Sequence, residues 1–294
     1  MLAVTLRYLV TGVNYADLMY SFRVARNSIS LFVPEVCEAS ISAYKEEVVP
    51  DNIPEEDWLR ISAESERVWN LPHACGALDG KHIRIKKTAD SGSLFYNYKK
   101  FFSMVVMAIV NADHKFIWVI FGSYGSSSDG QIFNNSALRP MLEEGTLGLR
   151  PPSPLPHHDR DTPYFLKGDD AFPLRPWIMK PYSRRHLDHD ERIFNIRLSR
   201  ARRVVENAFG ILAMRFQILL GTMQQLPETV DSIVLACTTL HNLLRITQPA
   251  ALRQYVDEED NSHNLVPGQW RQGSQLVDGE EGYQRNVGNA AGTA

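Results

Sequence analysis

The chain has 294 residues, a formal net charge of −3 and a hydrophobic share of 44%. These values are those of an ordinary globular protein of one large or two unequal domains. No apolar run reaches the roughly 18 residues that a membrane-spanning helix needs, which predicts no membrane partner. Cys37, Cys75 and Cys237 show neither a disulfide framework nor a zinc-type spacing, and no signal-peptide pattern opens the chain. We therefore expect an intracellular protein in a reducing compartment.

The first 45 residues show helical periodicity in three pieces. They run over 2–10, over 15–22 and from about residue 28, and Asn14 is placed to cap the second piece. Short helices joined by tight turns are typical of a helix-turn-helix, so residues 1–45 are predicted to be a small all-α domain. Arg26, Asn27 and Ser28 would then open the helix that enters the DNA major groove. The alternative is a three-helix module that only packs on its neighbour.

A connector over 46–75, with a helix over 55–70, leads to a strand around Asp79. In that strand Ile83 and Ile85 alternate with basic residues, which indicates one buried face. Two apolar segments follow over 101–112 and 115–124, and the corner between them predicts a hairpin turn.

The pattern after this hairpin predicts a helix over 131–144, a short strand over 164–167, and helices over 194–219 and 230–246. The tail over 247–294 is acidic and poor in large apolar groups, so we expect it to be disordered.

Four acidic side chains share a type of position: Asp79 in a strand, Asp129 and Asp169 after strands, and Glu206 in a helix. An acid on a central strand carries a desolvation cost unless an arginine or a divalent metal lies against it. Carboxylates at a sheet edge suit Mg²⁺ or Mn²⁺. The structural alternatives are capping for Asp129 and Asp169, and an i,i+4 ion pair with Arg202 for Glu206. Periodicity does not decide between these alternatives.

Four runs resemble, in the same order, the motifs of the PIF/Harbinger transposases and of the Harbinger transposase-derived nuclease. They are Gly76-Ala77-Leu78-Asp79-Gly80-Lys81-His82-Ile83, Gly125-Ser126-Ser127-Ser128-Asp129-Gly130 with Ile132, Phe133 and Ser136, Gly168-Asp169-Asp170-Ala171-Phe172-Pro173-Leu174, and Val205-Glu206-Asn207-Ala208-Phe209-Gly210. The resemblance extends over about residues 2–245. Ser128 stands where the family usually has histidine, a departure that leaves Asp129 in place.

The resemblance implies an α/β fold class, with an RNase H-like DDE nuclease domain over 76–246 built from a mixed sheet flanked by helices. It implies Asp79, Asp169 and Glu206 as a catalytic triad that holds Mg²⁺ or Mn²⁺, with Asp129 as a fourth acid near the metals. Asp169 rather than Asp170 is favoured, because the family ligand directly follows the glycine. The implied activity is endonucleolytic hydrolysis at transposon ends, with joining of the freed 3′-hydroxyl to target DNA in an active transposase.

A basic segment over 175–203 is compatible with a polyanionic partner or with solvated helix faces. Arg197, Arg200 and Arg203 lie near the last acid, and we expect them to contact DNA phosphates. Family analogy further suggests a Myb-like partner protein and a location in the nucleus, with the cytoplasm and self-association left open.

The main alternative is a domesticated, catalytically silent DNA-binding or adaptor protein, and the presence of all four acids favours the enzyme. A polymerase-type reading of 168–170 is disfavoured because no strand-turn-strand hairpin flanks it. Zinc is disfavoured because the loop histidines have no cysteine partners: His157, His158, His186 and His189.

Overall fold

The computed structural model describes residues 1–48, 53–89, 91–260 and 265–273. Its α-helices are α1 (Leu2–Thr11), α2 (Tyr15–Phe22), α3 (Arg26–Val48), α4 (Glu55–Trp69), α5 (Asp129–Asn135), α6 (Leu138–Glu143), α7 (His189–Arg215) and α8 (Pro227–Thr247). Short 3₁₀ helices are η1 (Gln217–Leu220), η2 (Pro249–Tyr255) and η3 (Gln269–Gln272). None of the helices in the described ranges is long and apolar enough to cross a bilayer.

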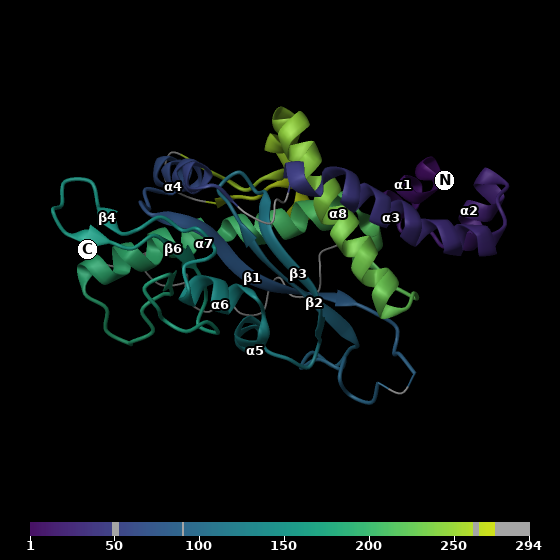
Figure 1. The fold of residues 1–294 in the computed structure, drawn as a ribbon, viewed down its shortest axis with the longest axis horizontal. Coiled ribbons are helices and arrows are strands. Elements are labelled where there is room, and N and C mark those ends of the chain that lie inside the picture. Colours follow the sequence, from purple (N-terminus) through teal and green to yellow (C-terminus); the bar gives the residue numbers. More distant parts are fainter. Residues whose placement is uncertain (49–52, 90, 261–264, 274–294) are drawn as a thin grey trace, which may run out of the picture.

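One five-stranded sheet runs through the molecule in the order β3-β2-β1-β6-β7 (Figure 1). Its strands are β1 (Ala74–Arg84), β2 (Ser103–Val110), β3 (Phe116–Tyr124), β6 (Phe165–Lys167) and β7 (Ile178–Met179). The first three strands are antiparallel, as predicted, whereas β6 pairs in parallel with β1 and with β7. Two small pairs lie outside this sheet: β4 (Ser153–Pro154) with β5 (Asp161–Thr162), and β8 (Glu258–Glu259) with β9 (Leu265–Val266). The mixed sheet flanked by helices fits the predicted RNase H-like architecture.

The two faces of the sheet pack against different helices. Ala77, Val106 and Ala108 join a core cluster with α7 and α8, whereas Leu78 and Met107 join a second cluster with α4, α5 and α6. This division follows from the period of two in a strand, which sends successive side chains to opposite faces. The same alternation assigns a face to each remaining residue of β1, including Asp79.

The N-terminal helices share the core of the sheet domain. Leu9 of α1 and Val33 of α3 belong to the same buried cluster as Ile233 of α8, and α1–α3 lie at one end of the molecule beside α8 (Figure 1). The predicted cap is confirmed, because the Asn14 side chain accepts hydrogen bonds from two backbone amides of α2. The start of α3, with Arg26, is exposed. Packing and exposure do not by themselves identify a DNA-binding module. A helix-turn-helix role for residues 1–45 and the domain boundary at residue 45 remain predictions.

Two predicted helices have different bounds in the structure. The helix expected over 131–144 is divided into α5 and α6, because the backbone becomes extended at Ser136. The helix expected from residue 194 begins at His189, where Asp188 and Glu191 form a reciprocal capping box. That capping pattern was present in the sequence and would have corrected the start.

Part of the tail over 247–294, which we expected to be disordered, packs on the fold. Trp270 is 7% exposed and packs with Ile211 of α7, together with Tyr255 and Val256. Asp257 is buried as well. Trp270 helps to anchor a segment whose average composition is polar, and an average composition does not reveal one buried aromatic side chain.

The β2–β3 hairpin is fastened to α8 by two side chains. The Asn242 side chain accepts a hydrogen bond from the backbone N of Phe116 (2.9 Å) and donates one to its backbone O (2.7 Å). The Nε2 of His241 lies 2.9 Å from the backbone O of His114, in the turn. Because β3 is an edge strand, Asn242 supplies at Phe116 the two bonds that a further strand would supply.

Replacing Asn242 by leucine should therefore destabilise the fold. Two buried backbone groups would lose their partners, at about 1–3 kcal/mol for each unsatisfied group. We expect a loss of about 2–4 kcal/mol in urea unfolding, whereas Asn135→Leu at an exposed helix end should change stability by less than about 0.5 kcal/mol. Equal stability of the two variants would contradict this role of Asn242.

Candidate functional site

Asp79 lies in the central strand β1, and Asp169 lies in the turn two residues beyond the end of the neighbouring strand β6. In the parallel pair of β1 and β6, Ala77 is opposite Lys167, and two further residues along each chain lead to Asp79 and Asp169. Positions two apart in a strand share a face, so Asp79 follows Ala77 on the face that packs on α7. Asp169 is on the same side, because it pairs with Arg202 of α7. Neighbouring strands are about 4.8 Å apart, which brings the two acids close together.

Burial makes the Asp79 carboxyl group a much weaker acid than usual. Loss of hydration raises its pKa to about 7, Arg202 opposes that rise, and the carboxylates of Asp129 and Asp169 add to it. A carboxyl group in such a position binds a cation readily, because a nearby positive charge restores the stability of its ionised form. The central acid therefore has the environment that the sequence predicted for it.

An arginine supplies part of that positive charge. The Arg202 side chain on α7 is only 8% exposed, and its Nη2 lies 3.9 Å from Oδ2 of Asp169. Among the described residues its Nε has no hydrogen-bond partner. The arginine that the sequence left open as the partner of Asp79 is thus present, and it pairs with Asp169 rather than with Glu206.

Asp129 approaches β1 from the other side. It lies in the first turn of α5, which Ser128 and Gln131 open with a capping box. Its carboxylate occupies the space where a side chain of residue 80 would lie, so any β-carbon at Gly80 would collide with it. Since Gly80 follows Asp79 in the strand, that space is on the opposite face of the sheet. Asp129 influences Asp79 electrostatically across the strand.

The loop after β6 packs against the same helix start. A β-carbon at Gly130 would lie 2.6 Å from the backbone O of Ala171, closer than such atoms can approach. The Oδ1 of Asp169 accepts a hydrogen bond from the backbone N of Ala171 (2.9 Å), which fixes the turn that carries Asp169. The glycine beside Asp129 therefore lets two of the predicted motifs touch each other.

Glu206 lies on α7 one turn after Arg202, with 35% of its side chain exposed. Its Oε2 is 3.8 Å from Nη2 of Arg271, a residue of the C-terminal part of the chain. The predicted ligand is thus on α7, which packs on β1, and it pairs with a cation from a segment that the sequence did not indicate.

The donor chemistry of these four acids fits a hard divalent cation, because carboxylate oxygens are the ligands that Mg²⁺ and Mn²⁺ prefer. Their arrangement is incomplete: in the described part of the chain no three His, Cys, Asp or Glu side chains are grouped closely enough to hold an ion. Asp129 lies on the opposite face and Glu206 pairs with Arg271. The roles of the individual acids therefore remain proposals.

Sequence reasoning missed one buried cation near the site. Lys167 is fully buried in β6, and its Nζ has no hydrogen-bond partner among the described residues. Burial lowers the pKa of Lys167 to about 8, against a smaller opposing effect of Cys75. A lysine inside the short run Phe165-Leu166-Lys167, two residues before Asp169, was the signal that could have revealed it.

The predicted DNA-contacting arginines Arg197, Arg200 and Arg203 all lie on α7 and are half-buried. They are thus on the helix that carries Glu206, and the structure does not test whether they bind DNA.

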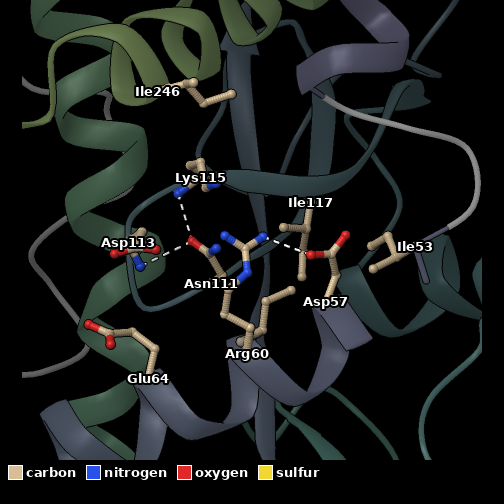
Figure 2. Close-up of a pocket in the computed structure, with 10 residues that line it drawn as sticks. Ile53, Asp57, Arg60, Glu64, Asn111, Asp113, Lys115, Ile117 and Ile246 are labelled. Carbon is tan, nitrogen blue, oxygen red and sulfur yellow. Dashed lines mark hydrogen bonds and ion pairs between the residues drawn. The ribbon is translucent and has the colours of Figure 1, made fainter. Parts of the chain in front are cut away.

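A separate cavity of about 310 Å³ lies between α4, the β2–β3 turn and the end of α8 (Figure 2). Asn111 is at its centre, with hydrogen bonds from the backbone amides of Asp113 (3.1 Å) and Lys115 (3.0 Å). None of the four predicted acids lines it. This cavity is therefore distinct from the acid pair on β1 and β6.

Replacing Asp79 by asparagine should stabilise the metal-free protein at alkaline pH. An unfolded aspartate ionises near pH 3.9, so between about pH 4 and pH 7 the folded state binds more protons, and the wild type loses stability as pH rises. Because Asp79 is only half-buried, we expect a gain of about 1–2 kcal/mol for Asp79→Asn at pH 8, shrinking toward pH 4.

Urea unfolding at several pH values without divalent ions measures this gain. Asp170→Asn is the matched control, because Asp170 is the exposed neighbour of Asp169. A similar response of both variants at pH 8 would refute the effect.

Replacing Gly130 by alanine should disturb the contact between α5 and the Asp169 turn. The new β-carbon meets a backbone atom that cannot simply rotate away, and we expect a loss of about 1–3 kcal/mol in stability. Gly273→Ala provides the comparison, since a β-carbon there meets nothing within 4 Å. If neither variant changes the midpoint of thermal unfolding, the start of α5 can move to accept the β-carbon, and the prediction is wrong.

The comparisons with known proteins agree with this architecture. A family model described as DDE superfamily endonuclease matches residues 78–242, more than half of the chain. "Protein ALP1-like" of Arabidopsis thaliana is 28% identical over 251 residues, which cover 82% of this chain and 59% of that protein. "Putative nuclease HARBI1" of Xenopus laevis is 25% identical over 226 residues, or 75% of this chain and 60% of that protein.

The human "Putative nuclease HARBI1" is 28% identical over 176 residues, which cover 59% of this chain and 46% of that protein. The chain thus spans about 60% or less of the length of these curated relatives. No solved structure matches it. With the family model matched from the first motif to α8, the chain belongs to the DDE superfamily endonucleases and is of the Harbinger-derived type that its motifs resemble.

Proposed function

We propose that the chain is a metal-dependent DNA endonuclease of the Harbinger transposase type that hydrolyses phosphodiester bonds at transposon ends. The supporting observation is that Asp79 lies in the central strand β1 and Asp169 just beyond the end of the neighbouring strand β6, each two residues after the paired Ala77 and Lys167. Burial and neighbouring carboxylates raise the pKa of Asp79 to about 7, so this pair favours the arrival of a cation. A nuclease domain implies DNA as the substrate.

In this proposal Asp79, Asp169 and Glu206 would hold Mg²⁺ or Mn²⁺, and Asp129 would act as a fourth acid nearby. When bound, such ions lower the pKa of a water molecule and stabilise the departing oxygen of the phosphodiester. The residues of the chain position the acids: β1 and β6 set the spacing of the aspartates, and α7 carries Glu206 toward them. Arg202 holds Asp169 at the edge of the site.

DNA contacts are proposed at two places. Arg197, Arg200 and Arg203 lie on the same helix as Glu206, where guanidinium groups could contact phosphates of the strand being cut. Arg26, Asn27 and Ser28 are exposed at the start of α3, as a groove-reading helix would require. Strand joining, a Myb-like partner, self-association and a nuclear location are further proposals that rest on the family resemblance.

A second candidate is a catalytically silent DNA-binding or adaptor protein. It is favoured by one feature of the structure, namely that cations of the chain already pair with two of the acids. Arg202 lies against Asp169, and Arg271 lies against Glu206. Such pairs would compensate the carboxylates in a protein that no longer binds metal.

Cleavage of DNA that carries candidate element ends, in the presence of Mn²⁺, separates these two functions. We expect the wild type to cut and Asp79→Ala to fall to background, because the ligand at the centre of the sheet is lost. Asp170→Ala should retain cleavage, since Asp170 is exposed and outside the proposed set. If wild type and Asp79→Ala both bind DNA but neither cuts, the adaptor function replaces the enzyme.

A further inference from the structure

A segment from the C-terminal part of the chain lies on α7 beside Glu206. We call it the strap and define it as residues 255–257 and 268–271, between which the β8–β9 pair forms. Its hydrogen bonds to α7, and the close approach of its Trp270 ring, fall on residues of the run 205–210, which contains the proposed ligand. Trp270 also packs on Ile211, one residue further along the helix.

Two residues of that run dock the strap. The Oδ1 of Asn207 accepts hydrogen bonds from Nε1 of Trp270 (2.6 Å) and from the backbone N of Asp257 (3.2 Å). The Trp270 ring lies directly over Gly210, where any β-carbon would collide with it. Asn207 is fully buried and Trp270 is 7% exposed, so the strap is a packed part of the fold.

The docked strap fixes the position of one guanidinium group. The Asp257 side chain is 2% exposed and accepts hydrogen bonds from Nε (2.9 Å) and Nη2 (2.7 Å) of Arg271, and from the backbone N of Gly268 (2.9 Å). The guanidinium carbon also lies 4.2 Å from the centre of the Trp270 ring. A two-pronged bond to a buried carboxylate leaves Arg271 little freedom to move.

This immobilised group is directed at the proposed ligand. Nη2 of Arg271 lies 3.8 Å from Oε2 of Glu206, and the same guanidinium is paired with Asp257. Glu206 therefore meets a cation whose position is fixed by a second carboxylate. Groups that surround metal ligands in this way orient them, and their loss commonly weakens metal binding by about 10–100-fold.

We propose that Arg271 is a positioning residue that orients the Glu206 carboxylate, which makes the strap part of the acid site. The proposal rests on the proposed function, because it requires Glu206 to be a ligand. In this proposal Asn207 and Gly210 bind the strap, and the strap places Arg271 against Glu206.

The test measures the Mn²⁺ affinity of the full chain by isothermal titration calorimetry, at a temperature where each variant is folded. The double variant Arg271→Gln with Asp257→Asn removes one positive and one negative charge, so the net charge of the site is unchanged. We expect its affinity for Mn²⁺ to fall about 10-fold. Arg139→Gln with Glu143→Gln removes the 2.9 Å ion pair of α6 in the same charge-neutral way and should leave affinity unchanged.

Unchanged or tighter Mn²⁺ binding by the double variant would overturn the proposal. If that variant does not fold, Arg271→Lys takes its place, because it keeps the charge but cannot form the two-pronged bond. The same loss of affinity is then expected, and an unaltered affinity overturns the proposal.

Glu206→Gln distinguishes this failure from failure of the proposed function. Mn²⁺ binding that depends on Glu206 but not on Arg271 overturns the positioning role alone. A wild type that does not bind Mn²⁺, or binds it without regard to Glu206, overturns both.

Discussion

Asp79 in the central strand and Asp169 just beyond the neighbouring strand require positive charge, and α7 supplies part of it through Arg202. Asp79 and Asp169 repel each other, and burial adds to the difficulty of ionising both. Arg202 and, more weakly, Lys81 favour the ionised form of Asp79 from within the protein. A divalent cation would add further positive charge, and the proposed chemistry follows from this electrostatic requirement.

The helix α7 serves three purposes through different faces. Val205 and Ala208 pack on the sheet, Asn207 and Gly210 receive the strap, and Glu206 pairs with Arg271 of the strap. Because one helix carries all of these groups, the docking of the strap and the ion pair of Glu206 depend on the same short run of α7.

Close approach of backbone segments is the second condition for the site. Gly80 makes room for the Asp129 carboxylate, and Gly130 makes room for the turn that carries Asp169. The sequence pattern of an acid beside a glycine therefore records a packing requirement as well as a chemical one. Neither glycine adopts an unusual backbone angle, so space rather than conformational freedom is the reason for it.

The amino-acid sequence by itself determined the strands β1, β2, β3 and β6, the hairpin, the cap at Asn14 and the positions of the four acids along the chain, since these depend on local periodicity and on motif residues. Only the tertiary structure decided on which face of the sheet Asp129 lies, that Arg202 pairs with Asp169, and that Arg271 pairs with Glu206. The two-residue strand β7 and the anchoring of the strap by Trp270 also escaped prediction. These features escaped prediction for the same reason. Periodicity specifies a helix or strand and its buried face. The partner of a charged side chain comes from a segment far away in the chain, and only tertiary packing selects it.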